Sequence, residues 1–286
     1  MFAIFSNRFA RTVLLCSLLF LSACSSTTFV YNRLDFFIPW YLDDYVELDR
    51  AQEEQLDALL LPFLGWHRQE ELPRYVALLD RIGGELDRPL SPAQIAAIYS
   101  DLEGAWLRLQ ERALEWLLVL GARLSDEQVE EFLEHLWERQ QDFEDEYLDR
   151  SDREYREESY EALRDSMQDY LGRLSSEQRD RLQAASMELQ RSDAIWLQER
   201  AVWLERLGIL LQRQPGWELR TREAIALRDE TVSAQYLATY EHNLGVIFSA
   251  VADVLNARSA EQDRRLRGEL RDLREDLEGL IAQGGD

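Results

Sequence analysis

Few side chains in this chain have the type and spacing needed for chemistry, and two cysteines are the first candidates. Cys16 lies inside the largely apolar run 12–21, and Cys24 follows Leu21-Ser22-Ala23 directly. A cysteine thiol is a nucleophile that can be modified covalently. The run has about half the roughly 20 apolar residues that a membrane-spanning helix needs, and two arginines precede it. This pattern predicts a cleaved targeting segment that ends just before Cys24.

The residues Leu21-Ser22-Ala23-Cys24 resemble the lipobox of bacterial lipoproteins. The resemblance implies that residues 1–23 are removed as a signal peptide and that Cys24 becomes the lipid-modified first residue. An ordinary signal peptide with an unmodified Cys24 is the alternative. We expect residues 24–28 to form the lipidated cysteine and a polar, flexible tether. Ser25 follows the cysteine where an Asp would favour the inner membrane, so we expect a periplasm-facing anchor in the outer membrane.

The composition excludes several kinds of catalysis. The chain has two cysteines, and both are consumed if residues 1–23 are removed and Cys24 is lipidated. The mature protein would then have neither disulfides nor a catalytic thiol. Every basic residue apart from the histidines is arginine, which excludes lysine Schiff-base chemistry.

Three histidines, at positions 67, 135 and 242, are the remaining candidates for catalysis or metal binding. His67 and Glu71, like Glu131 and His135, are four residues apart and would share a helix face. Di-iron helical bundles use Glu-x-x-His pairs and metalloproteases use His-Glu-x-x-His, and neither motif occurs in the sequence. We therefore predict a protein that is not an enzyme, with no catalytic residues, metal site or cofactor. We expect Trp66-His67-Arg68 to form a packed corner that bonds a neighbouring turn.

The charge of the chain limits its partners. The formal net charge is −23, so nucleic acid and anionic headgroups would repel this protein. We expect membrane attachment to rest on acyl chains at Cys24. Residues 126–165 contain seventeen acidic residues and five arginines. This stretch is either the solvated face of a long helix, a docking surface for a basic partner, or a loose sink for divalent cations.

The elements that position these residues are all expected to be helices, because apolar residues recur at intervals of three and four without long alternation. Five segments share a capping residue followed three positions later by Gln, which predicts a capping box at each helix start. These segments begin at Asp49, Ser91, Ser125, Ser175 and Ser259. The predicted helices span 32–47, 50–64, 68–83, 92–120, 126–171, 176–213, 218–256 and 260–282.

Long helices joined by short turns predict an all-α fold, an elongated antiparallel bundle of long helices. We expect residues 29–286 to form a single periplasmic domain, with a possible subdivision near 121–125 or 172–175. The polar segment 149–154 predicts a bend or a solvated overhang in the helix that contains it.

The helix starts also carry a resemblance. A leucine precedes the first four caps, and the resulting Leu-Ser-x-x-Gln pattern resembles the LTxxQ motif of the Spy/CpxP periplasmic chaperones. Ser replaces the usual Thr in three of the four stretches, and Asp replaces it at Asp49. The resemblance implies an ATP-independent holdase that cradles unfolding clients, although the cradle of that family is basic and this chain is acidic.

A second resemblance covers nearly the whole chain. It rests on FVYNRLDFFIPWYLDDY at 29–45, Trp66-His67-Arg68, Glu71-Leu72-Pro73-Arg74-Tyr75 and Gln214-Pro215-Gly216-Trp217. These segments resemble a family of proteobacterial lipoproteins that is a domain of unknown function. The resemblance implies a lipoprotein with a helical body and brings no known activity. The aromatic residues at 29–45 either lie on the bilayer as an interfacial belt or form the first layer of the core, and Asp35, Asp43 and Asp44 favour the core.

We therefore expect a lipid-anchored periplasmic protein that binds or scaffolds another envelope protein, of undefined oligomeric state. A Spy/CpxP-like holdase is the alternative. An enzyme acting on envelope glycans or lipids would need a convergent pair of acids that the sequence does not reveal.

Overall fold

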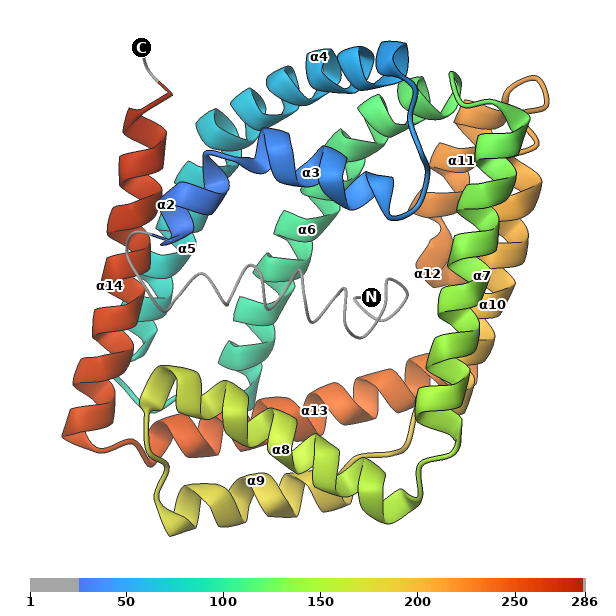
Figure 1. Ribbon diagram of the computed structural model, residues 1–286. Coiled ribbons are helices and arrows are strands. Elements are labelled where there is room, and N and C mark those ends of the chain that lie inside the picture. Colours follow the sequence, from blue (N-terminus) through green and yellow to red (C-terminus); the bar gives the residue numbers. More distant parts are fainter. Residues whose placement is uncertain (1–25, 285–286) are drawn as a thin grey trace. The chain divides into compact units, whose positions relative to one another are not determined.

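The computed structural model describes residues 26–284, and every regular element among them is a helix (Figure 1). The all-α prediction is confirmed for this part of the chain. The predicted signal peptide 1–23 and the predicted lipidation residue Cys24 lie outside the described residues. No helix in the described range is long and apolar enough to cross a membrane.

The helices vary widely in length. The elements are α2 (Ser26–Tyr31), α3 (Leu34–Asp43), α4 (Arg50–Trp66), the π-helix η2 (His67–Glu71), α5 (Leu72–Glu85), α6 (Pro92–Gly121), α7 (Asp126–Leu148), α8 (Asp152–Leu171), α9 (Ser176–Glu188), α10 (Asp193–Leu210), α11 (Trp217–Ala226), α12 (Arg228–Thr231), α13 (Ala234–Asn256) and α14 (Ala260–Ala282). The starts of α4, α6, α7, α9 and α14 fall where the capping pattern predicts them.

Several predicted boundaries are wrong. The expected helices 126–171, 176–213 and 218–256 are interrupted near 149–151, 189–192 and 232–233, the first of these within the polar segment where we expected a bend. The helix that follows the first break begins with a capping box at Ser151. The search for Gln three residues after a cap did not find it, because Ser151 is paired with Glu154. The expected flexible tether is also revised, since Ser26 to Thr28 lie in α2 and Thr27 is buried.

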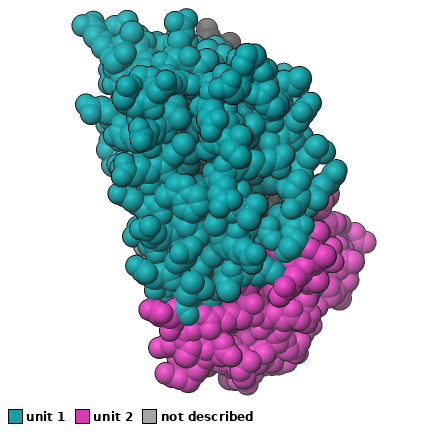
Figure 2. All heavy atoms as spheres, turned by 90° about the vertical axis from the view of Figure 1, so that its right-hand side faces the viewer, with its two compact units in different colours: residues 1–71, 105–148, 193–233 teal, residues 72–104, 149–192, 234–286 magenta. Residues whose placement is uncertain are grey.

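The expected single domain divides into two compact units (Figure 2). Unit 1 contains residues 26–71, 105–148 and 193–233 of the described chain, and unit 2 contains 72–104, 149–192 and 234–284. The positions expected for a subdivision, 121–125 and 172–175, each lie inside one unit. Each unit is therefore assembled from three separate stretches of sequence, which a linear search for linkers does not find.

In unit 1, α7 and α10 pack as an antiparallel pair, and α3 packs on α4. The antiparallel order follows from the ring contacts of Phe143 with Trp196 and from the bond between Arg213 and Asp126. A core of leucines, valine and tryptophan lies beneath them. Its buried members are Val46, Leu48, Leu56, Leu60, Trp116 and Leu120.

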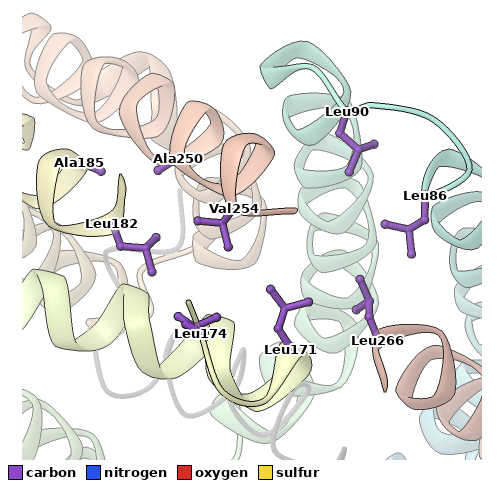
Figure 3. Packing of buried hydrophobic residues seen from close by; sticks show 9 residues of the cluster. All are labelled: Leu86, Leu90, Leu171, Leu174, Leu182, Ala185, Ala250, Val254 and Leu266. Carbon is purple, nitrogen blue, oxygen red and sulfur yellow. The ribbon is translucent and has the colours of Figure 1, made fainter. Parts of the chain in front are cut away.

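In unit 2, α14 runs antiparallel to α5, and α9 packs between α8 and α13. Ion pairs of Arg274 with Asp80 and of Arg267 with Asp87 fix the direction of the first pair. Figure 3 shows how side chains from these helices, and from turns next to them, meet in one cluster. The cluster consists of Leu86, Leu90, Leu171, Leu174, Leu182, Ala185, Ala250, Val254 and Leu266. Its leucines include Leu90 and Leu174, which precede two of the predicted caps.

The capping glutamines do more than cap, because four of them join helix starts in pairs. In unit 1 the side-chain amides of Gln52 and Gln128 bond each other reciprocally at 2.8 Å. Each oxygen also accepts from its own cap backbone, and each nitrogen also donates to a loop carbonyl, of Arg123 or Glu47. A carboxylate at either position has no N–H to donate, which gives a physical reason for Gln instead of Glu.

Unit 2 contains the equivalent pair. Gln178 and Gln262 bond each other reciprocally at 3.1 and 3.0 Å, and both are buried. Their second donors reach the carbonyls of Val254 and Arg173. All four hydrogen-bonding positions of each amide are thereby used, as buried polar groups require.

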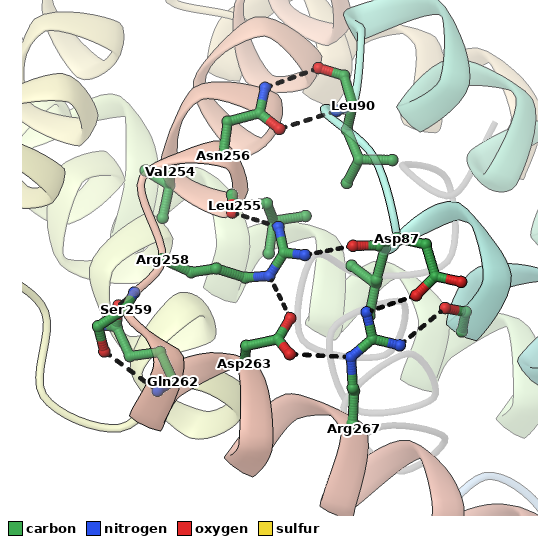
Figure 4. Close-up of polar contacts among 12 residues, drawn as sticks. Asp87, Leu90, Val254, Leu255, Asn256, Arg258, Ser259, Gln262, Asp263 and Arg267 are labelled. Carbon is green, nitrogen blue, oxygen red and sulfur yellow. Dashed lines mark hydrogen bonds and ion pairs between the residues drawn. The ribbon is translucent and has the colours of Figure 1, made fainter.

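The turn before α14 in unit 2 is held by further polar contacts (Figure 4). The side chain of Asn256 bonds both the N–H and the carbonyl of Leu90 at 2.8 Å. Arg258 donates to the carbonyls of Leu86 and Leu255 and to the carboxylate of Asp263. Hydrogen bonds from Arg258 and then Arg267 hold the pKa of Asp263 below its usual value. These contacts fix the entry into α14 from both sides of the turn.

Candidate functional site

The strongest candidate for a functional surface is the N-terminal aromatic segment, residues 29–45, which includes the end of α2, all of α3 and the following turn. Its inner face is attached to unit 1. Ile38 and Leu42 pack against the core cluster beneath α4 and α6. Expected core packing is therefore correct for this half of the segment.

The corner at Trp66-His67-Arg68 holds the start of the segment, as the sequence predicted. The Tyr31 hydroxyl and His67 Nδ1 are 2.9 Å apart, and the Arg68 guanidinium donates to the Asn32 side chain at 2.8 Å. Two bonds thus join the turn after α2 to η2, 36 residues later. They fix the rotation of the segment about its own axis.

The π-helix η2 begins at His67 and ends at Glu71, and it places both of these ionisable side chains toward the interior. Pro73 lies two residues beyond it, and a proline ring clashes with the carbonyl four residues earlier, here that of Gln69 inside η2. A helix that continues through proline must widen or bend at this point. Glu71, at the end of η2, is fully buried and accepts two bonds from Arg108 of α6, at 2.9 and 2.8 Å.

The end of the segment is held by α7. The hydroxyls of Tyr41 and Tyr45 are 2.8 Å apart. The pKa of Tyr41 is raised far above its usual value, mainly by burial and to a smaller extent by this hydrogen bond. The Tyr45 ring lies 6.4 Å from the ring of Phe132 and 6.2 Å from that of His135. Contacts with η2, the core and α7 together position the whole segment on unit 1.

The outer face of the segment has no such contacts with the core. Phe29, Phe36 and Trp40 are 55%, 62% and 58% exposed. Arg33 lies on the same face, with its guanidinium 4.9 Å from the centre of the Phe29 ring. The expectation that the aromatic run as a whole forms a core layer is therefore wrong for these three rings.

The other residues considered for chemistry do not converge. His135 lies against Tyr45, and exposed His242 of unit 2 bonds the Glu188 carbonyl at 3.0 Å. No group of three or more His, Cys, Asp or Glu side chains within residues 26–284 is arranged to hold a metal ion. In the acidic stretch 126–165, every carboxylate residue except Glu144 is exposed, as expected for a solvated face.

The buried Glu71–Arg108 pair is the contact that sequence reasoning missed. Arg108 lies within α6 among other charged residues, and nothing in its local sequence distinguishes it from Arg112. The proline after η2 is the one local signal, since it marks a place where the helix departs from regular geometry.

Burial lowers the pKa of His67 from 6.5 to about 4, and Glu71 opposes this shift. The folded protein therefore binds fewer protons than the unfolded chain between these values, so this contribution to stability is complete above about pH 6.5 and is lost as the pH falls toward 4. We expect His67→Gln to reduce the loss of unfolding free energy between pH 7.5 and pH 5 by about 1–2 kcal/mol. Urea unfolding at the two pH values measures this, with exposed His242→Gln as the control. If the free energy of unfolding depended on pH equally in the parent and in His67→Gln, a lowered pKa of His67 in the folded protein would be contradicted.

The fold and the site define a class of protein, an all-helical protein whose N-terminal aromatic segment is attached to unit 1 by a partly buried polar corner. The chain belongs to the family of unknown function DUF6279, which matches residues 44–236. The resemblance to a family of unknown function is thereby confirmed, although the match begins after α3. No curated protein and no solved structure matches the chain.

Proposed function

We propose that this chain is a lipid-anchored periplasmic protein that binds or scaffolds another protein at the cell envelope and does not act as an enzyme. The observation that carries the proposal is the position of α2. Ser25 alone separates Cys24 from the start of α2, and the segment that follows is attached to unit 1 through His67, Arg68 and the core. A lipid on Cys24 would therefore hold the folded body directly at the membrane surface.

Charge supports a role in binding. The net charge is −23, and the acidic residues of α7 in unit 1, apart from Glu144, are exposed. Such a surface favours a basic partner and raises its rate of association at low ionic strength. Ser25 after the cysteine supports the outer membrane as the location of the anchor.

The anchor is tested by replacing Cys24 with Ser. We expect the variant to appear in the soluble fraction of periplasm or lysate, with the thermal unfolding curve of the lipidated protein, because the substitution precedes the first described helix. Fractionation and circular dichroism measure the two properties. A variant that stays in the membrane fraction at the level of the parent would contradict lipid anchoring.

The binding role is tested by crosslinking in intact cells. We expect the lipidated protein to recover one reproducible envelope protein, and the Cys24→Ser variant to recover less of it because it is released from the membrane. Addition of salt should weaken the complex if the acidic surface contributes. Repeated recovery of no specific partner would count against scaffolding.

The holdase alternative is favoured by the Leu-Ser-x-x-Gln pattern, although the glutamines of three of these four starts, Gln52, Gln128 and Gln178, are occupied in the paired caps. A holdase should suppress aggregation of an unfolded client at near-stoichiometric ratio. The soluble Cys24→Ser protein is suited to this assay, and absence of suppression would exclude the alternative.

A further inference from the structure

The outer face of the N-terminal segment is an ordered row of side chains. The chain passes from α2 into α3 through a tight turn at residues 32–33, where Arg33 leaves helical geometry with φ −121°. Within α3, side chains at intervals of three and four lie on one side, and the guanidinium of Arg33 over the Phe29 ring places Phe29 beside Arg33. Phe29, Arg33, Phe36 and Trp40 follow intervals of four, three and four.

The rings of this face cannot turn inward without breaking the contacts of the opposite face. Tyr31 bonds His67, and Ile38 and Leu42 pack on the core of unit 1. Three aromatic residues more than half exposed within twelve positions form an unusual surface, because large apolar side chains grouped on a surface mark a site of interaction.

We propose that this face, Phe29, Arg33, Phe36 and Trp40, rests on the bilayer surface of the membrane that holds the lipid on Cys24. The inference depends on the proposed lipidation. Phe29 lies five positions after Cys24, and even a fully extended chain of that length spans no more than about 18 Å. The acyl chains would therefore keep the aromatic face within reach of the headgroups.

The chemistry of the face fits this occupant. Aromatic rings are favoured at the boundary between headgroups and acyl chains, where an amphipathic helix lies with its apolar side inserted by about 5–10 Å. Arg33 sits among the rings, where its guanidinium can bond a lipid phosphate. The acidic body disfavours an anionic bilayer, so zwitterionic lipid is the expected surface.

The absence of other cysteines from the predicted mature chain allows a specific test. Phe36→Cys and Phe29→Cys place a single thiol on the outer face, and Ile209→Cys places one on α10, at a position that is 67% exposed. Each full-length lipidated protein is labelled with a polarity-sensitive fluorophore and reconstituted into phosphatidylcholine vesicles with brominated acyl chains. We expect a blue shift and strong quenching at positions 36 and 29, and neither change at position 209.

Each outcome has a defined meaning. Emission at positions 36 and 29 that matches position 209 would overturn the proposal. Emission that depends on the ratio of protein to lipid would show that a second copy covers the face, and it would overturn the proposal as well. The parent protein is the control for lipidation, since labelling of the parent itself would reveal a free thiol and would mean that the proposed anchor, on which the inference rests, has failed.

Discussion

Replacement of Arg108 by Met is expected to lower the free energy of unfolding by about 3 kcal/mol or more, because it leaves the carboxylate of Glu71 buried without its bidentate partner. Glu71 is fully buried, and both of its oxygens accept from Arg108. Removing one member of a buried ion pair costs far more than the pair contributes, since the remaining charge stays buried without that partner. Urea unfolding of the purified variant measures the loss.

Two further variants test whether the loss of stability in Arg108→Met comes from the buried carboxylate of Glu71. Arg50 forms an exposed pair with Glu54, so Arg50→Met should change stability by less than about 1 kcal/mol. The double variant Glu71→Leu/Arg108→Met should be more stable than Arg108→Met alone, because apolar replacement of both partners also removes the buried carboxylate that has lost Arg108. A single Arg108→Met variant as stable as the parent would show that the buried pair is not a structural requirement.

Replacement of Gln178 by Glu is expected to destabilise unit 2 by about 3 kcal/mol, although the new side chain keeps the shape and the capping role of the old one. The carboxylate can still accept from the Ser175 backbone. It cannot donate to the Val254 carbonyl or to the Gln262 side-chain oxygen, so it would face two acceptors inside the protein. Hydrogen exchange at α9 and α14 should report the loss together with urea unfolding.

A matched control comes from the capping box at α8. Glu154 caps Ser151 at an exposed site, and there the exchange Glu154→Gln should cost only a few tenths of a kcal/mol. If Gln178→Glu and Glu154→Gln had equal effects, the paired amides would be ordinary caps without a role in joining helices. A large loss of stability at position 178 alone supports the conclusion that the paired glutamines link the two helix starts.

The sequence specified the helix starts well because a capping box is a local structure. The residues of the five boxes lie within four positions of each other, and the bonds they form are the ones expected. The pairing of Gln52 with Gln128 joins positions 76 residues apart, and Gln178 and Gln262 are 84 apart. A local sequence pattern does not identify partners so far apart in the chain. The pairing of the capping glutamines was therefore not predictable from one sequence.

The breaks inside the long predicted helices were less visible for a related reason. The segment near 189–192 contains neither Gly nor Pro, and its helix ends where Gln190 bonds Asn243 of α13. A tertiary contact thus competes with helix continuation at a site where propensity gives little warning. The division into two units is equally nonlocal, because each unit combines three stretches of chain.

For the candidate site, the sequence located the corner at His67 and the aromatic segment but not their faces. The sequence offers core and membrane as alternatives for the whole run 29–45, whereas in the structure Ile38 and Leu42 pack on the core and Phe29, Phe36 and Trp40 are exposed. The helical spacing of these residues is consistent with two opposite faces, one toward the core and one exposed. The side that faces the body became clear only from the partners on η2 and α7.

The mass of the N-terminal peptide of the mature protein, isolated from membranes, tests lipid anchoring at Cys24 most directly. Lipid anchoring predicts a peptide that begins at Cys24 and carries a diacylglyceryl group on its sulfur, with residues 1–23 removed. A mature protein that retains residues before Cys24, or that begins there with a free thiol, would contradict it.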